Sequence, residues 1–482
     1  MYWIEFNIGS VVKKLYHTNN MKKMLFAAAA FVWMAANAVV IDFTGATVPV
    51  RRLNGMCNTV PIRLNAVEPL DQRIRECFRA LEIPETRFHD PIIGSNSGVD
   101  LVDVSRIFPL FHADESDPRN YNFGPTDEYI ASARECGGEI EFRFGEQIES
   151  ERIKRRVNPP SDIAKWARIC LNIARHYNSG WARGYKWGIR RFSVWEEPDN
   201  DRLLTGATKG NFEKCYLPMY ASLARLIKAE WPDAHVGGPN TMGVCPKLMV
   251  FLEYCKSNDL PLDFCAVTSY GRVPEEQGKA IRMLRAALDR HGFAKTETEI
   301  SEWHYWTKYR FYDLDTFDAY VEELTGLDSA AYTTATLTCA QDAPVDHMFF
   351  YAANVNYFGI FDPLCYRPRP PYYALRDFAK VVHGAVRVPC PASPARGWYV
   401  MATRDDNGCG HLLVSALGAR GELRLELKGV RACAATSVVR RGEPCAFTDF
   451  AFENGVIRVA APRQGAVYRF SLELNDKEEV VR

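Results

Sequence analysis

Short apolar runs alternate with longer amphipathic segments between about residues 50 and 385. The apolar runs have the length and the flanking turn residues of buried strands. In chain order, the predicted strands are RRLNGMC, ETRFHD, GEIEFRFG, RRFSVWEE, AHVGGPN, LDFCAVTSY, TETEISEWH and DHMFFYAAN. The pattern therefore predicts an α/β fold.

The segments between most of these runs have helical periodicity. Residues 159–180 begin with two prolines and an aspartate, repeat apolar residues every three or four positions, and stop at Gly180. Residues 211–232, 247–259 and 276–292 behave similarly. Strands that alternate with helices over about 330 residues predict a (β/α)₈ TIM barrel. A doubly wound sheet is the alternative, but no GxGxxG sequence follows the first strand, and eight units favour closure.

The pattern changes after about residue 386. Apolar and polar residues then alternate with a period of two, and glycine, aspartate and asparagine mark turns. We therefore predict a barrel domain over 39–385, an antiparallel β-sandwich over 386–474 and a short tail over 475–482. The sandwich is expected to support the barrel, with carbohydrate binding as an alternative role.

The N-terminal region has the pattern of an export signal. Residues 21–38 contain two lysines, an apolar stretch too short to span a bilayer, and a small-x-small sequence, ANA, at their end. They predict a signal peptide, a mature chain that starts near Val39, and a secreted or periplasmic protein. Residues 1–20 are interpreted as an upstream extension.

Composition and charge narrow the possible partners. The chain is 47% apolar, and its 59 basic and 59 acidic residues cancel. This balance argues against nucleic acid or an anionic membrane as a partner, and no membrane span is expected in the mature chain. The 14 cysteines form no CxxC pair and no Cys–His cluster, so neither a metal nor another cofactor is predicted. Disulfides and the oligomeric state stay open.

Two predicted strands end in carboxylates. The fourth ends in Glu196 and Glu197 before a proline, which stops the strand, and the seventh ends in Glu302. Because reactive groups of TIM barrels lie at the C-terminal ends of strands, these residues are expected at one barrel mouth. Two carboxylates placed there can serve as the proton donor and the nucleophile or base of a glycosidase.

Several segments resemble glycoside hydrolase family 39, which includes β-xylosidases and α-L-iduronidases. The resemblance covers most of the predicted barrel, with its pieces in the family's order. These pieces are RFHD, YNFGPTDEYIASARECGGEIEFRFGE, PPSDIAKWARICLNIARHY, VWEEPDN, HVGGPNT and DFCAVTSYG. The resemblance implies a retaining glycosidase with its acid/base on strand four and its nucleophile on strand seven.

The resemblance assigns catalytic roles to two residues. Glu197 matches the family's acid/base and Glu302 its nucleophile. Glu196 stands where the family has an asparagine that binds the 2-hydroxyl of the sugar. An ionised carboxylate can only accept a hydrogen bond, so Glu196 is either a changed substrate contact or the partner of a nearby cation. If both side chains face the same way, Glu196 should raise the pKa of Glu197.

Further residues are implied as sugar contacts. Tyr270 could bind the nucleophile, Thr268 replaces the family's histidine on strand six, and Trp306 is one of the aromatic residues that could stack on a sugar. The predicted substrate-binding residues are His89, Trp195, Glu196, Tyr270, Trp303, Tyr305 and Asn354.

The resulting hypothesis is a retaining glycoside hydrolase, xylosidase-like or a related exo-glycosidase, that acts on a poly- or oligosaccharide. The alternative is a non-catalytic carbohydrate-binding protein on a degenerate barrel, which the changes at Glu196 and Thr268 would favour.

Overall fold

The computed structural model describes residues 38–60, 68–90, 101–147, 156–307, 315–353, 358–362 and 365–475. The predicted upstream extension, nearly all of the predicted signal peptide and nearly all of the predicted tail lie outside these residues. The predicted sugar contact Asn354 lies outside them as well.

Eight parallel strands form a closed barrel, which confirms the predicted fold. The barrel closes where the last strand pairs with the first. In barrel order, the strands are β3 (Gly55–Cys57), β4 (Glu85–Phe88), β5 (Glu139–Phe144), β6 (Arg191–Val194), β7 (His235–Met242), β8 (Phe264–Gly271), β9 (Glu297–Tyr305) and β10 (His347–Phe350). The strands that carry the candidate carboxylates, β6 and β9, are therefore the fourth and the seventh.

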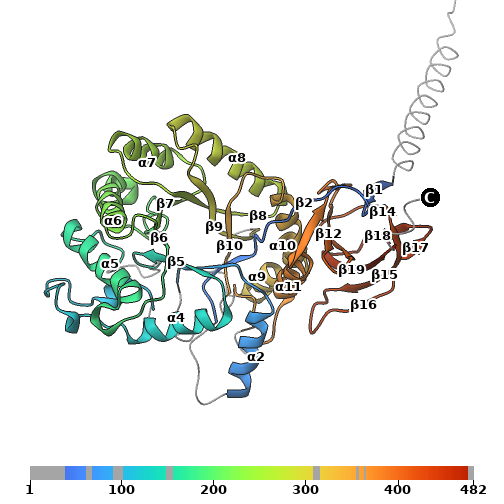
Figure 1. Ribbon diagram of the computed structural model, residues 1–482, viewed down its shortest axis with the longest axis horizontal. Helices are drawn as coiled ribbons and strands as arrows, with labels where there is room; N and C mark the ends of the chain where they lie inside the picture. The colour runs from blue at the N-terminus through green and yellow to red at the C-terminus, as the bar shows by residue number, and fades with distance from the viewer. Residues whose placement is uncertain are drawn as a thin grey trace, which may run out of the picture.

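Helices surround the barrel (Figure 1). The main ones are α2 (Glu68–Arg79), α4 (Gly124–Cys136), α5 (Ile163–Asn178), α6 (Leu217–Glu230), α7 (Pro246–Ser257), α8 (Pro274–His291), α9 (Phe317–Thr325), α10 (Leu327–Ala340) and α11 (Pro370–Val382). Shorter turns are α3 (Val104–Ile107), η1 (Pro118–Asn120), η2 (Trp181–Arg183), η3 (Ala207–Lys209) and the π-helical η4 (Phe212–Tyr216).

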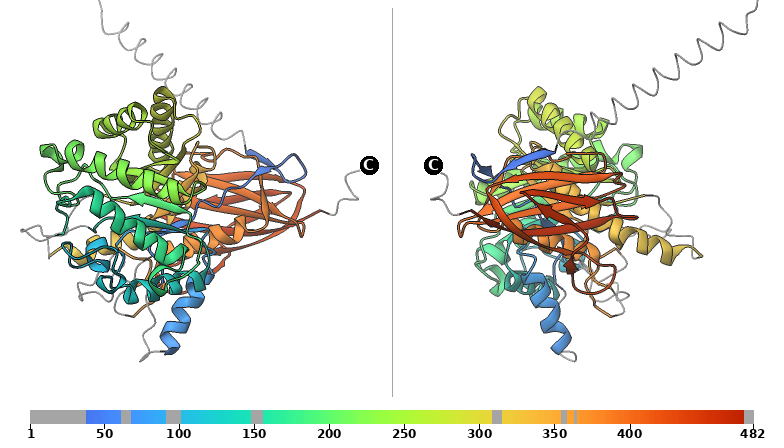
Figure 2. Two further views of the ribbon diagram at one scale, coloured as in Figure 1. Left: turned by 60° about the vertical axis from the view of Figure 1, so that its left-hand side comes forward. Right: turned by 90° about the vertical axis from the view of Figure 1, so that its right-hand side faces the viewer.

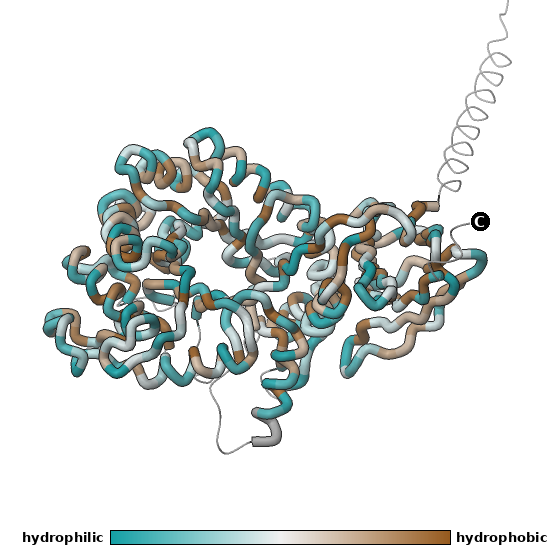
Figure 3. Tube along the Cα trace, viewed as in Figure 1, coloured by the Kyte–Doolittle hydropathy of each residue, from teal (hydrophilic) through white to brown (hydrophobic). Residues whose placement is uncertain are grey.

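Local signals explain where these helices begin and end. The Asp162 carboxylate accepts a hydrogen bond of 2.9 Å from the backbone N of Lys165 and so caps α5. Gly180 follows this helix with φ 75°, a conformation that favours glycine. Along the outer helices, hydrophobic and hydrophilic residues alternate (Figure 3), because one face of each helix packs against the barrel.

The C-terminal domain is a sandwich of two sheets. The four-stranded sheet has the order β1-β14-β18-β17, and the seven-stranded sheet has the order β16-β15-β19-β13-β12-β11-β2. The strands from this part of the chain are β11 (Ala385–Val388), β12 (Trp398–Asp405), β13 (Cys409–Ala416), β14 (Glu422–Lys428), β15 (Val430–Ser437), β16 (Cys445–Phe447), β17 (Ala451–Glu453), β18 (Val456–Ala460) and β19 (Ala466–Leu474).

Two strands of the sandwich come from the N-terminal end of the described chain. β1 (Val39–Asp42) pairs in parallel with β14, and β2 (Val48–Pro49) pairs with β11. The predicted start of the barrel domain at residue 39 is therefore too early, and the sandwich contains one parallel pair in addition to its antiparallel ones. The local pattern of these short strands does not specify their partners, which follow more than 330 residues later.

The sandwich packs against α10 and α11, beside the barrel (Figures 1 and 2). Two buried hydroxyl groups connect the domains. The Ser415 hydroxyl donates to the carbonyl of Ala331 and the Thr403 hydroxyl to the carbonyl of Val381, both at 2.6 Å. These bonds satisfy carbonyl groups of the two helices at the interface.

The structure also bears on the disulfides, which the sequence left open, and on the expected absence of a membrane span. All 14 cysteines lie among the described residues, and each is a free thiol. No helix in the described part of the chain combines the length and the apolar character needed to cross a bilayer.

The N-terminal strand should contribute to stability. Ile41 on β1 is 0% exposed in the sandwich core, whereas the neighbouring Val40 is 44% exposed. We expect Ile41→Ala to lower the free energy of unfolding of the sandwich by about 2–5 kcal/mol. The matched variant Val40→Ala should change it by less than about 0.5 kcal/mol. Urea unfolding would measure both, and equal effects would show that β1 does not pack as described.

Candidate active site

The end of β6 directs two adjacent carboxylates into different surroundings. Trp195 and Glu197, which follow the strand, have φ values of 64° and 33°, a conformation that is uncommon for residues other than glycine. The backbone is held from both sides. The N–H of Trp195 donates to Phe144 on β5 at 2.6 Å, and that of Glu197 donates to Asn240 on β7 at 3.1 Å. Because the chain turns here, the side chains of Glu196 and Glu197 do not follow the strict two-residue alternation of a strand.

Glu197 lies toward β8 and receives two hydrogen bonds. The hydroxyl of Thr268 donates to its Oε1 and the amide of Asn200 to its Oε2, each at 2.9 Å. Burial and the negative charges of Glu302 and Glu196 nevertheless raise the pKa of Glu197 to about 8. Glu197 is therefore protonated at neutral pH, as a general acid must be.

Glu302 lies at the C-terminal end of β9, where its backbone pairs with that of Thr268 on β8. His89 Nε2 lies 3.0 Å from its Oε1, and the hydroxyl of Tyr270 donates to its Oε2. Burial favours the neutral acid. However, the charges of His89 and Arg87 and the hydrogen bonds from His89 and Tyr270 outweigh burial and lower the pKa of Glu302 to about 2.

Thr268 thus binds the carboxyl group of Glu197 and pairs through its backbone with Glu302, but the two carboxyl groups are driven to opposite protonation states. Glu302 is ionised and can act as a nucleophile, while Glu197 retains a proton that it can donate. Pairs of titratable groups whose environments move their pKa values apart are typical of acid and base assignments in active sites.

His89 contributes a positive charge beside the nucleophile. Burial opposes its protonation, but Glu302, Asp90 and Glu196 raise the pKa of His89 to about 9. The backbone N–H of His89 donates to the side chain of Asn58 at 3.0 Å, which holds the residue at the end of β4. His89, which the sequence predicts as a sugar contact, therefore lies beside the nucleophile at the end of β4.

Glu196 points to a different partner, the buried guanidinium of Arg87. Arg87 Nη2 donates to Glu196 Oε2, its Nε donates to Glu141 at 3.1 Å, and its Nη1 lies 3.8 Å from Glu302. Burial raises the pKa of Glu196, and the charge of Arg87 opposes this shift. The sequence left two roles open for Glu196, a changed substrate contact or the partner of a cation. The structure shows the second, with Arg87 as the cation.

A second layer of charge supports Arg87 from inside the barrel. Arg191 on β6 lies 3.5 Å from Glu141, 2.8 Å from Glu299 and 2.7 Å from Glu297. Glu141 therefore lies between two arginines and partly compensates the charge of both. The sequence analysis did not identify Arg87 or Glu141 as site residues. The sequence feature that could have identified them is a charged residue at an inward-facing position of an otherwise apolar strand.

The site has one group of possible metal ligands among the described residues. Ligand atoms of His89, Glu196 and Glu302 lie within 4.8 Å of one another. However, the Arg87 guanidinium contacts two of these carboxylates, and His89 itself is protonated at neutral pH. The cationic partners of the carboxylates are therefore protein groups, and this donor set does not fit a resident metal ion.

Three aromatic residues predicted to contact sugar are turned into the protein. Trp195 is 1% exposed, and its Nε1 donates to the carbonyl of Leu203 at 2.6 Å. Trp303 and Tyr305 contact Tyr332 on α10 instead. Strand alternation explains the last two, because neighbours of an inward-facing Glu302 must face outward. For these three residues, the predicted stacking role is wrong.

Other aromatic residues surround the nucleophile. The ring of Tyr270 lies 5.4 Å from that of Trp306 and 6.4 Å from that of Tyr351, and the ring of Tyr351 lies 5.6 Å from that of His89. The hydroxyl of Tyr351 also donates to Asp90 at 2.7 Å. These half-buried rings form an apolar surface on which a sugar ring can stack.

Comparisons with known proteins agree with this arrangement. Residues 57–296 match the model of Glycosyl hydrolases family 39. A search of curated protein sequences found no match.

Several solved structures share the fold. A glucosidase from Croceicoccus marinus is 20% identical with a TM-score of 0.69, and the match covers 91% of this chain and 100% of that one. A GH39 β-xylosidase from Caulobacter crescentus is 18% identical with a TM-score of 0.65, covering 91% and 100%. A GH39 enzyme from Xanthomonas axonopodis pv. citri is 17% identical with a TM-score of 0.64, covering 90% and 97%. With the family match and the paired carboxylates, these findings lead to one conclusion: the chain belongs to glycosyl hydrolases family 39 and is a glycoside hydrolase.

Proposed function

We propose that the protein is a retaining exo-glycosidase, xylosidase-like or closely related, that uses a double displacement. The observation that carries this proposal is the opposite shift of two carboxyl pKa values at the ends of β6 and β9, about 8 for Glu197 and about 2 for Glu302. It supports catalysis over the non-catalytic carbohydrate-binding alternative, because a binding protein has no need of one protonated and one ionised carboxyl group.

In the first step, Glu302 attacks the anomeric carbon while Glu197 protonates the departing oxygen. This gives a glycosyl-enzyme ester and the released alcohol. In the second step, the now ionised Glu197 removes a proton from water, which displaces Glu302. Arg87, His89 and Tyr270 keep the nucleophile ionised, and the desolvated surroundings of Glu197 favour return of its proton.

Aromatic residues beside the nucleophile bear on the sugar that is bound. The half-buried surface of Tyr270, Trp306 and Tyr351 supports a stacked sugar ring, and the named neighbours include a β-xylosidase and a glucosidase. A panel of nitrophenyl glycosides would rank pentosides against hexosides. We also infer that the chain is exported, on the strength of the signal-peptide pattern in residues 21–38.

The catalytic roles are testable with azide. We expect Glu197→Gln to lower turnover by about 10²–10⁴-fold and Glu302→Gln to lower it at least as much. Azide is a nucleophile that needs no general base, so in the second step of a Glu197→Ala variant it can attack the glycosyl-enzyme in place of water and displace Glu302. It should restore turnover and give a glycosyl azide of retained configuration. With Glu302→Ala, azide should attack in place of the nucleophile and give the inverted product.

Glu196→Gln is the matched control. It should lose activity because it removes the charge opposite Arg87, but azide should not restore it. Azide rescue at position 196 and none at position 197 would reverse the assignment of the proton donor.

The hydrogen bond from Thr268 should control the basic limb of the pH profile. Glu197 must be protonated, so kcat/KM should fall as pH rises through about 8. The Thr268 hydroxyl stabilises the ionised form and lowers this pKa. We therefore expect Thr268→Val to raise the pKa and move the basic limb to higher pH.

Thr333→Val, which alters a buried hydroxyl on α10, should leave both limbs unchanged. A basic limb that stays in place or moves to lower pH in Thr268→Val would contradict the assignment of that limb to Glu197.

The export proposal predicts processing between Ala38 and Val39. Protein purified from its native host should begin near Val39, and N-terminal sequencing would show it. A full-length chain retained in the cytoplasm would contradict the proposal.

A further inference from the structure

Asp90 is a carboxylate at the barrel mouth to which the catalytic mechanism gives no role. It directly follows His89 at the end of β4. Its Oδ1 accepts a hydrogen bond from the side-chain amide of Asn58, and its Oδ2 accepts one from the hydroxyl of Tyr351, both at 2.7 Å. The backbone N–H of Asp90 also donates to the side chain of Asn58 at 3.2 Å. Because both of its oxygens accept hydrogen bonds, the group is held as a carboxylate in a fixed position.

Asp90 and the proton donor Glu197 are held by opposite parts of the barrel. Asp90 and its two partners follow β4, β3 and β10, which are neighbours in the barrel. Glu197 follows β6 and is bound by residues of β7 and β8. One strand separates the two sets on each side, β5 on one and β9 on the other. Asp90 therefore lies across the mouth from the group that protonates the leaving oxygen.

The nucleophile Glu302 lies between these two sets of strands, on β9. His89, the neighbour of Asp90 in the chain, has its Nε2 3.0 Å from Glu302 Oε1. The ring of Tyr351, which binds Asp90, lies 5.6 Å from that of His89. The leaving group must lie on the side of Glu197 to receive its proton. The sugar that is transferred to Glu302 therefore extends away from Glu197, toward the part of the mouth where Asp90 lies.

The negative charge of Asp90 is less compensated than that of Glu196. Glu196 is fully buried against the guanidinium of Arg87, whereas Asp90 is half-buried and forms no ion pair with any residue that the structure describes. The charge of Asp90 helps to raise the pKa of His89. However, the imidazole of His89 is 5% exposed and is directed at Glu302. Asp90 thus presents a negative charge to the open mouth.

Asp90, Tyr351 and Glu302 present hydrogen-bond acceptors to this part of the mouth. Two of them are carboxylates, and the hydroxyl proton of Tyr351 is already donated to Asp90. Their remaining lone pairs match the hydroxyl groups of a neutral sugar, which can donate. An ionised sugar carboxylate has no proton to donate. Its charge would also be repelled by Asp90 and Glu302, and the repulsion is strong once a bound sugar excludes water.

We propose that Asp90 determines which sugar the enzyme accepts. Its carboxylate accepts a hydrogen bond from a hydroxyl group of the sugar that is transferred to Glu302, and it excludes sugars that carry a carboxylate of their own. This inference rests on the proposed function and narrows its substrate class to glycosides of neutral sugars, in preference to those of uronic acids. Asp90 acts by direct contact with the sugar, and Tyr351 and Asn58 hold its carboxylate in position.

Three nitrophenyl β-glycosides with the same leaving group separate the effect of charge from that of size. The β-xyloside, the β-glucoside and the β-glucuronide share their ring hydroxyl groups and differ only in the substituent at C5, which is a hydrogen, a hydroxymethyl group or a carboxylate. The last two substituents have similar sizes. We expect the mature wild-type chain to hydrolyse the glucoside with a kcat/KM at least about tenfold higher than that for the glucuronide, because like charges repel in the site.

Asp90→Asn keeps the shape of the side chain and removes its charge. It should lower the preference for the glucoside at least about tenfold, because the repulsion and a charge-assisted hydrogen bond are both lost. An indirect effect through His89 acts on all three glycosides alike and cancels in the ratio. Asp199→Asn is the matched control. Asp199 is a half-buried carboxylate on the Glu197 side of the mouth, where the backbone N–H of Met242 donates to it, and its variant should keep the preference.

Tyr351→Phe distinguishes contact with the sugar from a structural role of Asp90. It removes the hydroxyl that donates to Asp90 but keeps the charge, so the preference for the glucoside over the glucuronide should persist. If Asp90 served only to position Tyr351, the two variants would behave alike. Thermal unfolding verifies that every variant is folded.

Equal kcat/KM values for the glucoside and the glucuronide in the wild-type chain, or a preference for the glucuronide, would overturn the proposal, and this measurement needs no variant. An unchanged ratio in Asp90→Asn would overturn it too, as would equal changes of the ratio in Asp90→Asn and either of the other two variants. Failure to hydrolyse any of the three glycosides refutes the proposed function instead, since all three present the same leaving group to Glu197.

Discussion

The buried guanidinium of Arg87 is the group on which the active site depends. Removing a cation from water costs several kcal/mol, and only well-placed carboxylates can offset this cost. Glu141 and Glu196 do so directly, and Glu302 lies at the edge of the same cluster. Because Arg87, Glu141 and Glu302 belong to β4, β5 and β9 and Glu196 directly follows β6, the charge balance also connects these four strands at the barrel mouth.

This cluster explains why two glutamates follow each other at the end of β6. Glu196 compensates Arg87, and Glu197 faces Thr268 and Asn200, so each carboxylate has its own partners despite their adjacency. Their proximity still has a chemical effect, since the charge of Glu196 helps to hold the proton on Glu197. One residue thus compensates buried charge and also adjusts its catalytic neighbour.

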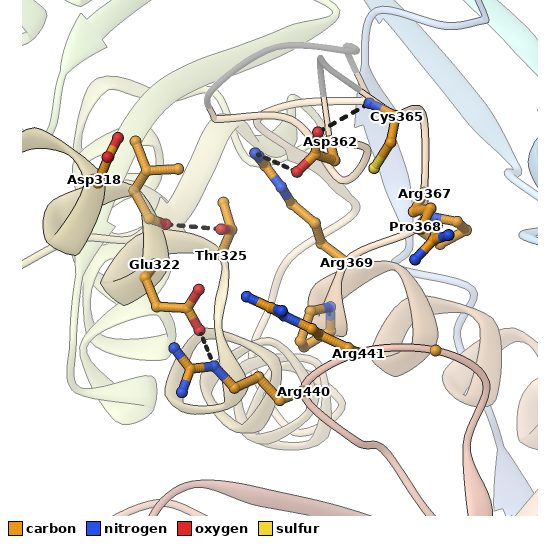
Figure 4. A pocket seen from close by; sticks show the side chains of 13 residues that line it. Asp318, Glu322, Thr325, Asp362, Cys365, Arg367, Pro368, Arg369, Arg440 and Arg441 are labelled. Carbon is orange, nitrogen blue, oxygen red and sulfur yellow. Dashed lines mark hydrogen bonds and ion pairs between the residues drawn. The ribbon is translucent and has the colours of Figure 1, made fainter.

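The sandwich is more than an addition to the C-terminal end of the barrel. Its two sheets are completed by β1 and β2 from the other end of the described chain, and it packs on α10 and α11. Arg440, Arg441 and Gly442, between β15 and β16, line a cavity together with residues of α9 (Figure 4). The domain therefore stabilises the barrel and also shapes a surface on its catalytic side.

The sequence by itself determined the barrel, the sandwich and the strand ends that carry Glu197 and Glu302. Helical and strand periodicities are local, and a proline or a glycine next to them marks where an element stops. The tertiary structure alone decided which charges meet. Arg87 and Glu196 are 109 positions apart in the chain, and no local pattern pairs them. It also decided that Trp195 packs inside while Tyr351 faces the site, and that the N-terminal strands join the sandwich. These features depend on the closure of the barrel and on contacts between distant segments. Such contacts form only in the folded chain, where buried charges need partners and apolar surface is removed from water.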